Sequence, residues 1–189
     1  MEENLKQQPS TCLKVVFFGP ESTGKSTLAE RLANHFETVW VKEYMREYLQ
    51  KKWDLTKTIC EPQDLMIIAN GQMKQENKLA PIANKVLFCD TDLLQLKVYS
   101  EAYYNGYCNP TLHKHALNNW YDLYFLTNID TPWVPDDLRD KPHDREGMFR
   151  RFHNILLQTN RPFIILNGDE NERFETAIAR IDKLLKPEN

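Results

Sequence analysis

The chain has 189 residues, of which 41% are hydrophobic and 27% charged, and its formal net charge is −3 with a pI near 6.0. These values are typical of one soluble globular domain with a sizeable core. The slightly acidic charge gives no indication of a basic surface that would bind nucleic acid. No apolar stretch of the sequence is long enough to cross a membrane. We therefore expect a cytoplasmic protein with small-molecule ligands, while the composition leaves its oligomeric state open.

Two features of the sequence define the expected domain. Residues 1–12 are polar and contain Pro9, which predicts a short flexible arm and excludes a secretory signal. Residues 13–189 are expected to form a single domain. The four cysteines are far apart and include no C-x-x-C pair, so we expect neither a zinc site nor a disulfide framework.

Short apolar segments alternate with amphipathic segments along the chain. This alternation predicts a three-layer α/β fold, in which helices cover both faces of a five-stranded, mostly parallel sheet. The expected strands are Leu13–Phe18, Thr38–Val41, Lys85–Cys89, Leu123–Thr127 and Phe163–Leu166. The expected helices run over Lys25–Phe36, Pro62–Leu79, from Asp92 to Tyr104, and over Glu146–Gln158 and Glu172–Leu185. Ligands of such folds bind at the carboxyl ends of the strands.

The run GPESTGKS, from Gly19 to Ser26, matches the phosphate-loop (P-loop) pattern G-x-x-x-x-G-K-[ST] between the first strand and the first helix. Gly19 and Gly24 allow backbone conformations in which consecutive N–H groups point inward and bind an anion. The positive end of the helix dipole adds to this attraction. The motif therefore predicts a site for a nucleoside triphosphate.

Each polar residue of the loop has an expected role. Lys25 is expected to reach the β- and γ-phosphates and to act in catalysis, and the Ser26 hydroxyl to hold a magnesium ion. We expect ATP and Mg²⁺ as the cofactors. The ATP site also includes Glu21, Ser22, Thr23 and Thr27, although Thr27 could instead cap the helix or pack.

The third expected strand leads directly into Asp90-Thr91-Asp92. P-loop proteins place a carboxylate near the magnesium ion at the end of an apolar strand, so Asp90 is a candidate catalytic and metal-binding residue. The alternative is a helix cap, which Thr91 or Asp92 could also provide. Asp92 could bind the acceptor, orient its hydroxyl, or lie in the first helical turn.

A polar and aromatic cluster, Lys42 to Tyr48, follows the second strand and predicts an acceptor site at the same edge of the sheet. Glu43 is the candidate base, because a carboxylate there can accept the proton of an attacking hydroxyl. Arg46 could contact phosphate, or it could form an i,i+3 ion pair with Glu43.

A segment rich in proline and charge precedes the late helix, and we expect residues 133–147 to form a lid over the nucleotide. Arg139 is the expected catalytic arginine and Arg145 an ATP-binding one, with Arg150 and Arg151 as substitutes. The alternative is an exposed, solvated loop.

Four motifs, GPESTGKS, EYMRE, LFCDTD and WVPDDLR, together resemble the ribosylnicotinamide kinase domain of NadR-type proteins, from about Leu13 to Leu185. The resemblance implies transfer of the ATP γ-phosphate to the 5′-hydroxyl of nicotinamide riboside, giving nicotinamide mononucleotide. It also implies that the residues near the acceptor are Glu43, Tyr44, Asp90 and Asp92, and that Arg139 lies in the lid. The H-x-G-H motif and helix-turn-helix of NadR-type proteins are absent from this sequence, so we expect neither adenylyl transfer nor repression.

Nicotinamide riboside is a flat cation, so its site should offer aromatic faces and carboxylates. The candidate aromatic residues are Tyr44, Tyr99, Tyr103, Tyr104, Tyr107, Trp120 and Trp133. Another nucleoside or metabolite is the alternative acceptor. The rival class is a nucleotide-dependent switch or ATPase, but the sequence lacks the D-x-x-G and N-K-x-D motifs of a GTPase switch at the expected positions.

Overall fold

The structure is a computed structural model that describes residues 5–134 and 144–186. Five strands form one sheet in the order β2-β3-β1-β4-β5, and every neighbouring pair is parallel. The strands are β1 Leu13–Phe18, β2 Trp40–Val41, β3 Val86–Asp90, β4 Leu123–Thr127 and β5 Phe163–Leu166. The sheet is therefore wholly parallel, where the sequence predicted a mostly parallel one.

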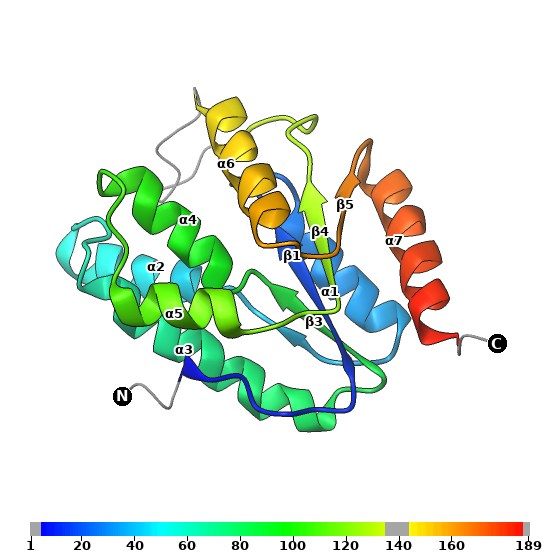
Figure 1. The fold of residues 1–189 in the computed structure, drawn as a ribbon. Coiled ribbons are helices and arrows are strands. Elements are labelled where there is room, and N and C mark those ends of the chain that lie inside the picture. The colour runs from blue at the N-terminus through cyan, green and yellow to red at the C-terminus, as the bar shows by residue number, and fades with distance from the viewer. Residues whose placement is uncertain (1–4, 135–143, 187–189) are drawn as a thin grey trace.

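Helices cover both faces of this sheet (Figure 1). The helices α1 (Lys25–His35) and α7 (Glu170–Leu185) pack on one face. The helices α3 (Asp64–Leu79), α4 (Leu93–Tyr103), α5 (Pro110–Asn118) and α6 (Arg145–Gln158) cover the other, α2 (Tyr44–Thr56) packs beside α3, and the short η2 (Ala80–Ile82) follows α3. The expected three-layer fold is confirmed.

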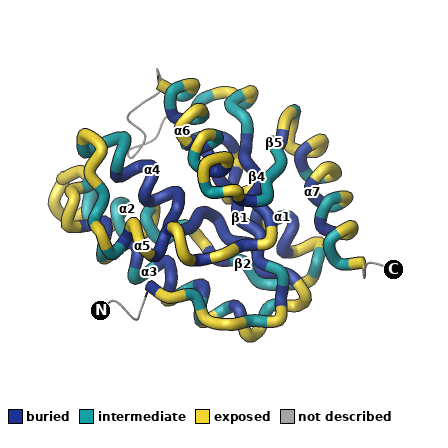
Figure 2. Tube along the Cα trace, in the orientation of Figure 1, coloured by how far each residue is buried: buried dark blue, intermediate teal, exposed yellow. Residues whose placement is uncertain are grey.

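The central strand β1 shows why these layers form. Its side chains alternate between the faces, so Val15 and Phe17 enter the core under α1 and α7, while Val16 and Phe18 enter the opposite core. All four are fully buried. Figure 2 shows β1 in the dark blue of buried residues at the centre of the molecule. Because such a strand is buried on both faces, its sequence is a continuous apolar run.

Two helices, α2 and α5, were missing from the sequence prediction. The helix α2 has no fully buried residue, although Met45, Tyr48 and Leu49 lie at helical spacing and pack half-buried against the core. Its first residues were interpreted as a polar and aromatic acceptor cluster, so the helix was missed. The helix α5 is short, but it does carry start signals: the Asn109 side chain accepts hydrogen bonds from two backbone N–H groups, and Pro110 occupies the first helical position.

The N-terminal segment is also different from expectation. Residues 5–12, which we expected to be part of a flexible arm, pack against the domain. Leu5 is fully buried, its carbonyl accepts a 3.1 Å hydrogen bond from Asn119 Nδ2, and Gln7 Nε2 donates to Glu76 Oε1 at 2.8 Å. Hydrogen bonds hold this segment on the domain, so its polar composition was not a sign of flexibility.

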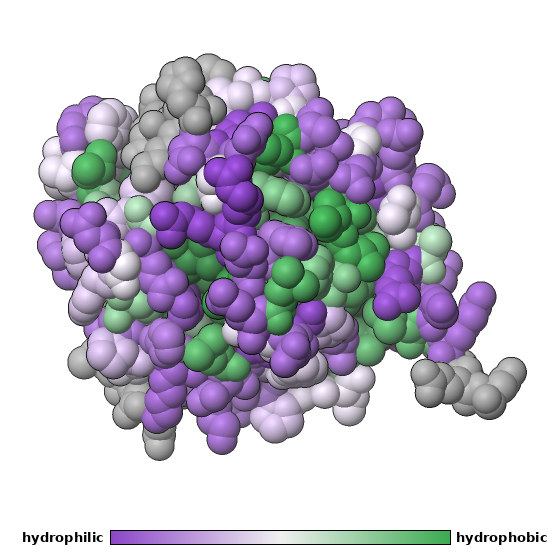
Figure 3. All heavy atoms as spheres, turned by 45° about the horizontal axis from the view of Figure 1, so that its top comes forward, coloured by the Kyte–Doolittle hydropathy of each residue, from purple (hydrophilic) through white to green (hydrophobic). Residues whose placement is uncertain are grey.

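The structure also describes much of the surface and all four cysteines. Within residues 5–134 and 144–186, no helix is both long and apolar enough to span a bilayer. Hydrophilic side chains dominate the face shown in Figure 3, and hydrophobic ones lie in scattered groups. All four cysteines are free thiols.

Candidate active site

The loop between β1 and α1 has a backbone that depends on glycine. Gly19 has φ +131° and Gly24 has φ +78°. A Cβ atom at Gly19 would lie 3.0 Å from both the carbonyl oxygen and the Oγ1 of Thr127, so β4 leaves no room for a side chain there. Gly24 is the N-cap of α1, in the left-handed conformation that glycine adopts at little cost.

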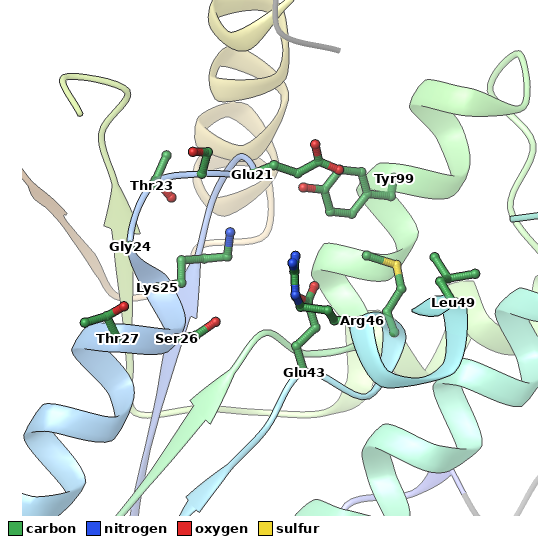
Figure 4. A pocket seen from close by; sticks show the side chains of 12 residues that line it. Glu21, Thr23, Gly24, Lys25, Ser26, Thr27, Glu43, Arg46, Leu49 and Tyr99 are labelled. Carbon is green, nitrogen blue, oxygen red and sulfur yellow. The ribbon is translucent and has the colours of Figure 1, made fainter. Parts of the chain in front are cut away.

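A cavity of about 310 Å³ lies between this loop and the start of α2. In Figure 4, Lys25 and Ser26 point toward Glu43 and Arg46 across the cavity, and Glu21 extends from the loop toward Tyr99. The Lys25 ammonium group donates hydrogen bonds to the carbonyls of Gly19 (3.0 Å) and Pro20 (2.6 Å). The cavity is lined by Glu21, Ser22, Thr23, Gly24, Lys25, Ser26, Thr27, Glu43, Met45, Arg46, Leu49 and Tyr99.

Asp90 lies at the end of β3 next to the loop. Because β3 pairs with β1 and places Asp90 beside Phe17, the carboxylate reaches Ser26, whose hydroxyl donates a 2.5 Å hydrogen bond to Oδ2. Asp90 is 1% exposed, and its Oδ1 atom has no hydrogen-bond partner among the described residues. Burial raises the pKa of Asp90, while Lys25 and the Ser26 hydrogen bond lower it.

This pair fits a magnesium ion that binds together with a nucleotide. Mg²⁺ is held in such sites by one or two carboxylates plus substrate phosphates, and the buried, unsatisfied Oδ1 of Asp90 is a suitable oxygen ligand. In the described part of the chain, no group of three or more His, Cys, Asp or Glu side chains could hold a metal by itself. The donor set therefore suits a metal that arrives with phosphate.

Glu43 is the N-cap residue of α2 and is half-buried in the wall of the same cavity. The pKa of its carboxyl is raised to about 7: burial and then the charge of Asp90 raise it, and Lys25 and Arg46 partly offset this effect. A carboxyl with a pKa near neutrality is well suited to accept a proton at physiological pH. The exposed Arg46 also lowers the pKa of Asp90, so its charge acts on both carboxylates.

Asp92 is part of the packing around the start of α4. Asp92 is the N-cap residue of α4, and its Oδ1 accepts a 2.9 Å hydrogen bond from the backbone N–H of Gln95. Its Oδ2 accepts a 2.7 Å hydrogen bond from the Tyr124 hydroxyl. Burial raises the pKa of Asp92 to about 6. Thr91 between the two aspartates has φ +72°, a strained value for a β-branched residue. A contact of Asp92 with an acceptor stays a prediction.

Tyr44 does not line the cavity. Its ring packs on Gly71 of α3, where an added Cβ atom would lie 2.1 Å from the ring, and its backbone N–H donates to Gln72 Oε1 at 2.8 Å. In this structure Tyr44 therefore anchors α2 to α3.

The expected lid is only partly described. Arg139 lies outside the described residues, as does the rest of 135–143. Arg145 begins α6 and donates hydrogen bonds to the carbonyls of Thr131 (2.8 Å) and Ser22 (3.4 Å), so its guanidinium group lies against the loop. Arg150 and Arg151 are exposed on α6.

A second, mostly apolar cavity of about 250 Å³ adjoins the first one. The two share Glu21, Met45, Leu49 and Tyr99. The remaining wall includes Trp53, Tyr103 and Tyr104, together with Thr58, Ile59, Cys60 and Leu65. Three of the expected tyrosines thus converge, while Tyr107 and Trp120 are about half exposed and line neither cavity. Trp53 was missed because α2 was not predicted as a helix.

A third cavity of about 380 Å³ lies on the other side of the phosphate loop. Its walls come from the loop and α1 (Ser22, Thr23, Gly24, Thr27 and Leu28), from the segment after β4 (Thr131, Pro132 and Val134) and from the start of α7 (Glu170 and Arg173). The loop therefore separates this space from the cavity that contains Glu43.

Two residues near the loop carried no sequence signal. Gln95 is buried, and its Oε1 accepts a 3.1 Å hydrogen bond from the backbone N–H of Gly19. Arg173 is 3% exposed, and its NH1 atom donates a 2.7 Å hydrogen bond to the carbonyl of Thr23. Neither belongs to a recognisable motif, because these contacts join residues 76 and 150 positions apart.

This loop, with Lys25 and Ser26 at its helix and Asp90 on the adjacent parallel strand, defines a P-loop nucleotide-binding domain. A family model described as an AAA domain matches residues 14–173. The chain therefore belongs to the AAA domain family.

The comparisons also find more specific relatives. The trifunctional NAD biosynthesis/regulator protein NadR of Escherichia coli is 30% identical over 174 residues, which cover 91% of this chain and 42% of that protein. A crystal structure of NadR protein in complex with NR superimposes with a TM-score of 0.75 at 21% identity, over 95% of this chain and 54% of the other. A deoxyadenosine kinase from M. mycoides has a TM-score of 0.68 at 15% identity, over 91% of this chain and all of its own. The chain thus spans about half the length of NadR. The deoxyadenosine kinase has the same fold as this chain.

Proposed function

We propose that this protein is an ATP-dependent kinase that phosphorylates the 5′-hydroxyl of nicotinamide riboside to give nicotinamide mononucleotide. The observation that carries the proposal is the cavity in which Lys25 and Ser26 lie opposite Glu43, with Asp90 hydrogen-bonded to Ser26 behind its wall and a cavity rich in aromatic side chains adjoining it. The similarity to NadR over most of this chain supports the same acceptor.

The donor side of the reaction is the phosphate loop. Backbone N–H groups and Lys25 bind the phosphates, and Ser26 and Asp90 are the residues that would hold Mg²⁺. When bound, the ion neutralises charge that develops on the phosphates. The nucleoside part of ATP would occupy the cavity beyond the loop, since the acceptor needs the side that contains Glu43.

The acceptor side is the wall formed by α2 and α4. The acceptor hydroxyl attacks the γ-phosphorus, the bond to the β,γ-bridging oxygen breaks, ADP leaves, and Glu43 takes the hydroxyl proton. The faces of Trp53, Tyr99 and Tyr103 suit a flat cationic ring, and the carboxylates of Glu21 and Glu43 add favourable charge. Arg139 and Arg145 would stabilise the transferring phosphoryl group from the lid.

A kinase for another nucleoside is the second candidate, because the deoxyadenosine kinase fold matches over its full length. Assays with ATP, Mg²⁺ and a panel of nucleosides separate the two candidates. We expect the highest kcat/KM for nicotinamide riboside. Preferential phosphorylation of a deoxynucleoside would favour the second candidate, and hydrolysis that no acceptor changes would favour an ATPase or switch.

A further inference from the structure

Arg173 is a buried charge that the proposed chemistry does not use. It lies one turn into α7, whose N-terminus is fixed by a capping box between Asp169 and Glu172. Its guanidinium group makes an ion pair with Asp130. It also donates to three backbone carbonyls, those of Gly168 (2.9 Å), Thr23 (2.7 Å) and Asn128 (3.1 Å).

These contacts join three separate loops at the carboxyl edge of the sheet. Thr23 belongs to the phosphate loop, Asn128 and Asp130 follow β4, and Gly168 precedes α7. Asp130 Oδ2 also accepts a 2.7 Å hydrogen bond from the backbone N–H of Gly168, which closes the network. Two of these loops, the phosphate loop and the segment after β4, form walls of the third cavity together with the start of α7, where Arg173 itself lines it.

The contact with Thr23 has a consequence for phosphate binding. A trans peptide is planar, and its C=O and N–H bonds point in opposite directions. Because Arg173 holds the Thr23 carbonyl, the N–H of Gly24 in the same peptide is directed away from Arg173. Gly24 is the N-cap of α1, where backbone N–H groups are available to bind an anion.

We infer that Arg173 is a positioning residue for the ATP donor, which orients the Gly24 N–H toward the phosphates and fixes the walls of the cavity for the nucleoside. The inference rests on the proposed donor site. It makes Arg173, which lies 150 positions after Thr23 in the sequence, a residue that determines nucleotide affinity. Lysine cannot replace this group, because an ammonium ion lacks the planar fork that reaches carbonyls in several directions.

The test is calorimetric binding of ADP and of inorganic pyrophosphate to the full chain, well below its unfolding transition, with steady-state kinetics alongside. For Arg173→Lys we expect the Kd for ADP and for pyrophosphate, and the KM for ATP, to rise roughly tenfold. The acceptor KM should stay within about twofold of wild type. The control is Arg31→Lys: Arg31 lies on α1 and pairs with Glu170 of α7, the helix that carries Arg173, and within residues 5–134 and 144–186 it makes no hydrogen bond to the loop.

A second variant separates positioning from stability. Asp130→Asn removes the ion pair but leaves the three carbonyl contacts, so it should lower Tm and retain the affinity for ADP. Wild-type ADP affinity in Arg173→Lys, or an equal loss of affinity in Asp130→Asn, would overturn the inference. A wild-type protein that binds ADP but transfers no phosphate would overturn only the proposed function.

Discussion

The Ser26 hydroxyl donates a 2.5 Å hydrogen bond to Asp90 Oδ2, and this contact joins the first turn of α1 to the end of β3. It follows from the parallel pairing of β1 and β3, which brings the strand that leads into the phosphate loop beside the strand that ends in a carboxylate. The pair is where the proposed kinase would hold its metal ion.

Asp90→Asn should lower kcat/KM roughly hundredfold or more and at the same time raise Tm. Loss of one group that stabilises transition-state charge has an effect of this size. Burial raises the pKa of Asp90, so its ionised form destabilises the fold above that pKa, and a neutral amide removes the penalty. Kinetics and thermal unfolding at pH 8 check both effects. The exposed Asp182→Asn is the control and should change neither; wild-type activity in Asp90→Asn would contradict the assigned role.

Glu43→Gln should remove a limb of the pH–rate profile. With a pKa of about 7, Glu43 changes from acid to base as the pH rises through neutrality, so wild-type kcat/KM should increase across that range. The Gln variant should transfer phosphate slowly at every pH while it binds ATP with nearly unchanged affinity. If it is fully active, the base is another carboxylate, with Asp90 and Asp92 next in order.

The same variant should change how stability depends on pH. Between pH 4.5 and about 7 the folded protein retains a proton on Glu43 that the unfolded chain has released, so this group makes the fold less stable as the pH rises. Glu43→Gln should therefore be more stable than wild type above pH 7, and the difference should disappear below pH 4.5. Urea unfolding at a series of pH values measures this difference. An equal difference at every pH would mean that the carboxyl pKa is not raised.

Trp53→Ala should weaken binding of the acceptor and not of ATP. The side chain lines the second cavity, which adjoins the one lined by Glu43. Loss of an aromatic face from a cationic ligand corresponds to roughly 1–2 kcal/mol, or about tenfold in KM. The matched control is Trp120→Ala, because Trp120 is half exposed and contacts Arg161 instead. An acceptor KM that is equal in both variants would place the acceptor elsewhere.

Gly71→Ala should destabilise the protein although alanine favours helices. The propensity gain is about 1 kcal/mol, but the new methyl group would meet the Tyr44 ring, and such overpacking costs roughly 1–3 kcal/mol. The control is Gly147→Ala in α6, where the nearest group is the mobile end of the Asp144 side chain. Chemical denaturation should show a lower free energy of unfolding only for Gly71→Ala. Equal effects of the two changes would argue against the packing of Tyr44 on α3.

The sequence predicted those features that have a local cause. Three strands, β1, β4 and β5, were predicted to the residue, because each is a continuous apolar run, although β5 at the edge of the sheet is only partly buried. The loop from Gly19 to Ser26 was predicted because its chemistry requires those residue types at that spacing.

Features that depend on tertiary contacts were not predictable in this way. The first residues of α2 were interpreted as an acceptor cluster and not as a helix, so the position of Trp53 in the wall of the second cavity was missed as well. The sequence analysis assigned no role to Arg173, because its contact with Thr23 exists only in the folded chain. Tyr44 was expected near the acceptor from the family resemblance, and its packing on Gly71 is likewise a tertiary contact that the sequence does not show.

The most direct test of the proposed function is detection of the product. Purified protein is incubated with ATP, Mg²⁺ and nicotinamide riboside, and the products are identified by mass spectrometry, with Lys25→Ala as the inactive control. We predict that nicotinamide mononucleotide and ADP form in equal amounts and that the variant forms neither at a comparable rate. Formation of ADP and inorganic phosphate alone, at a rate that nicotinamide riboside does not change, would contradict the proposal.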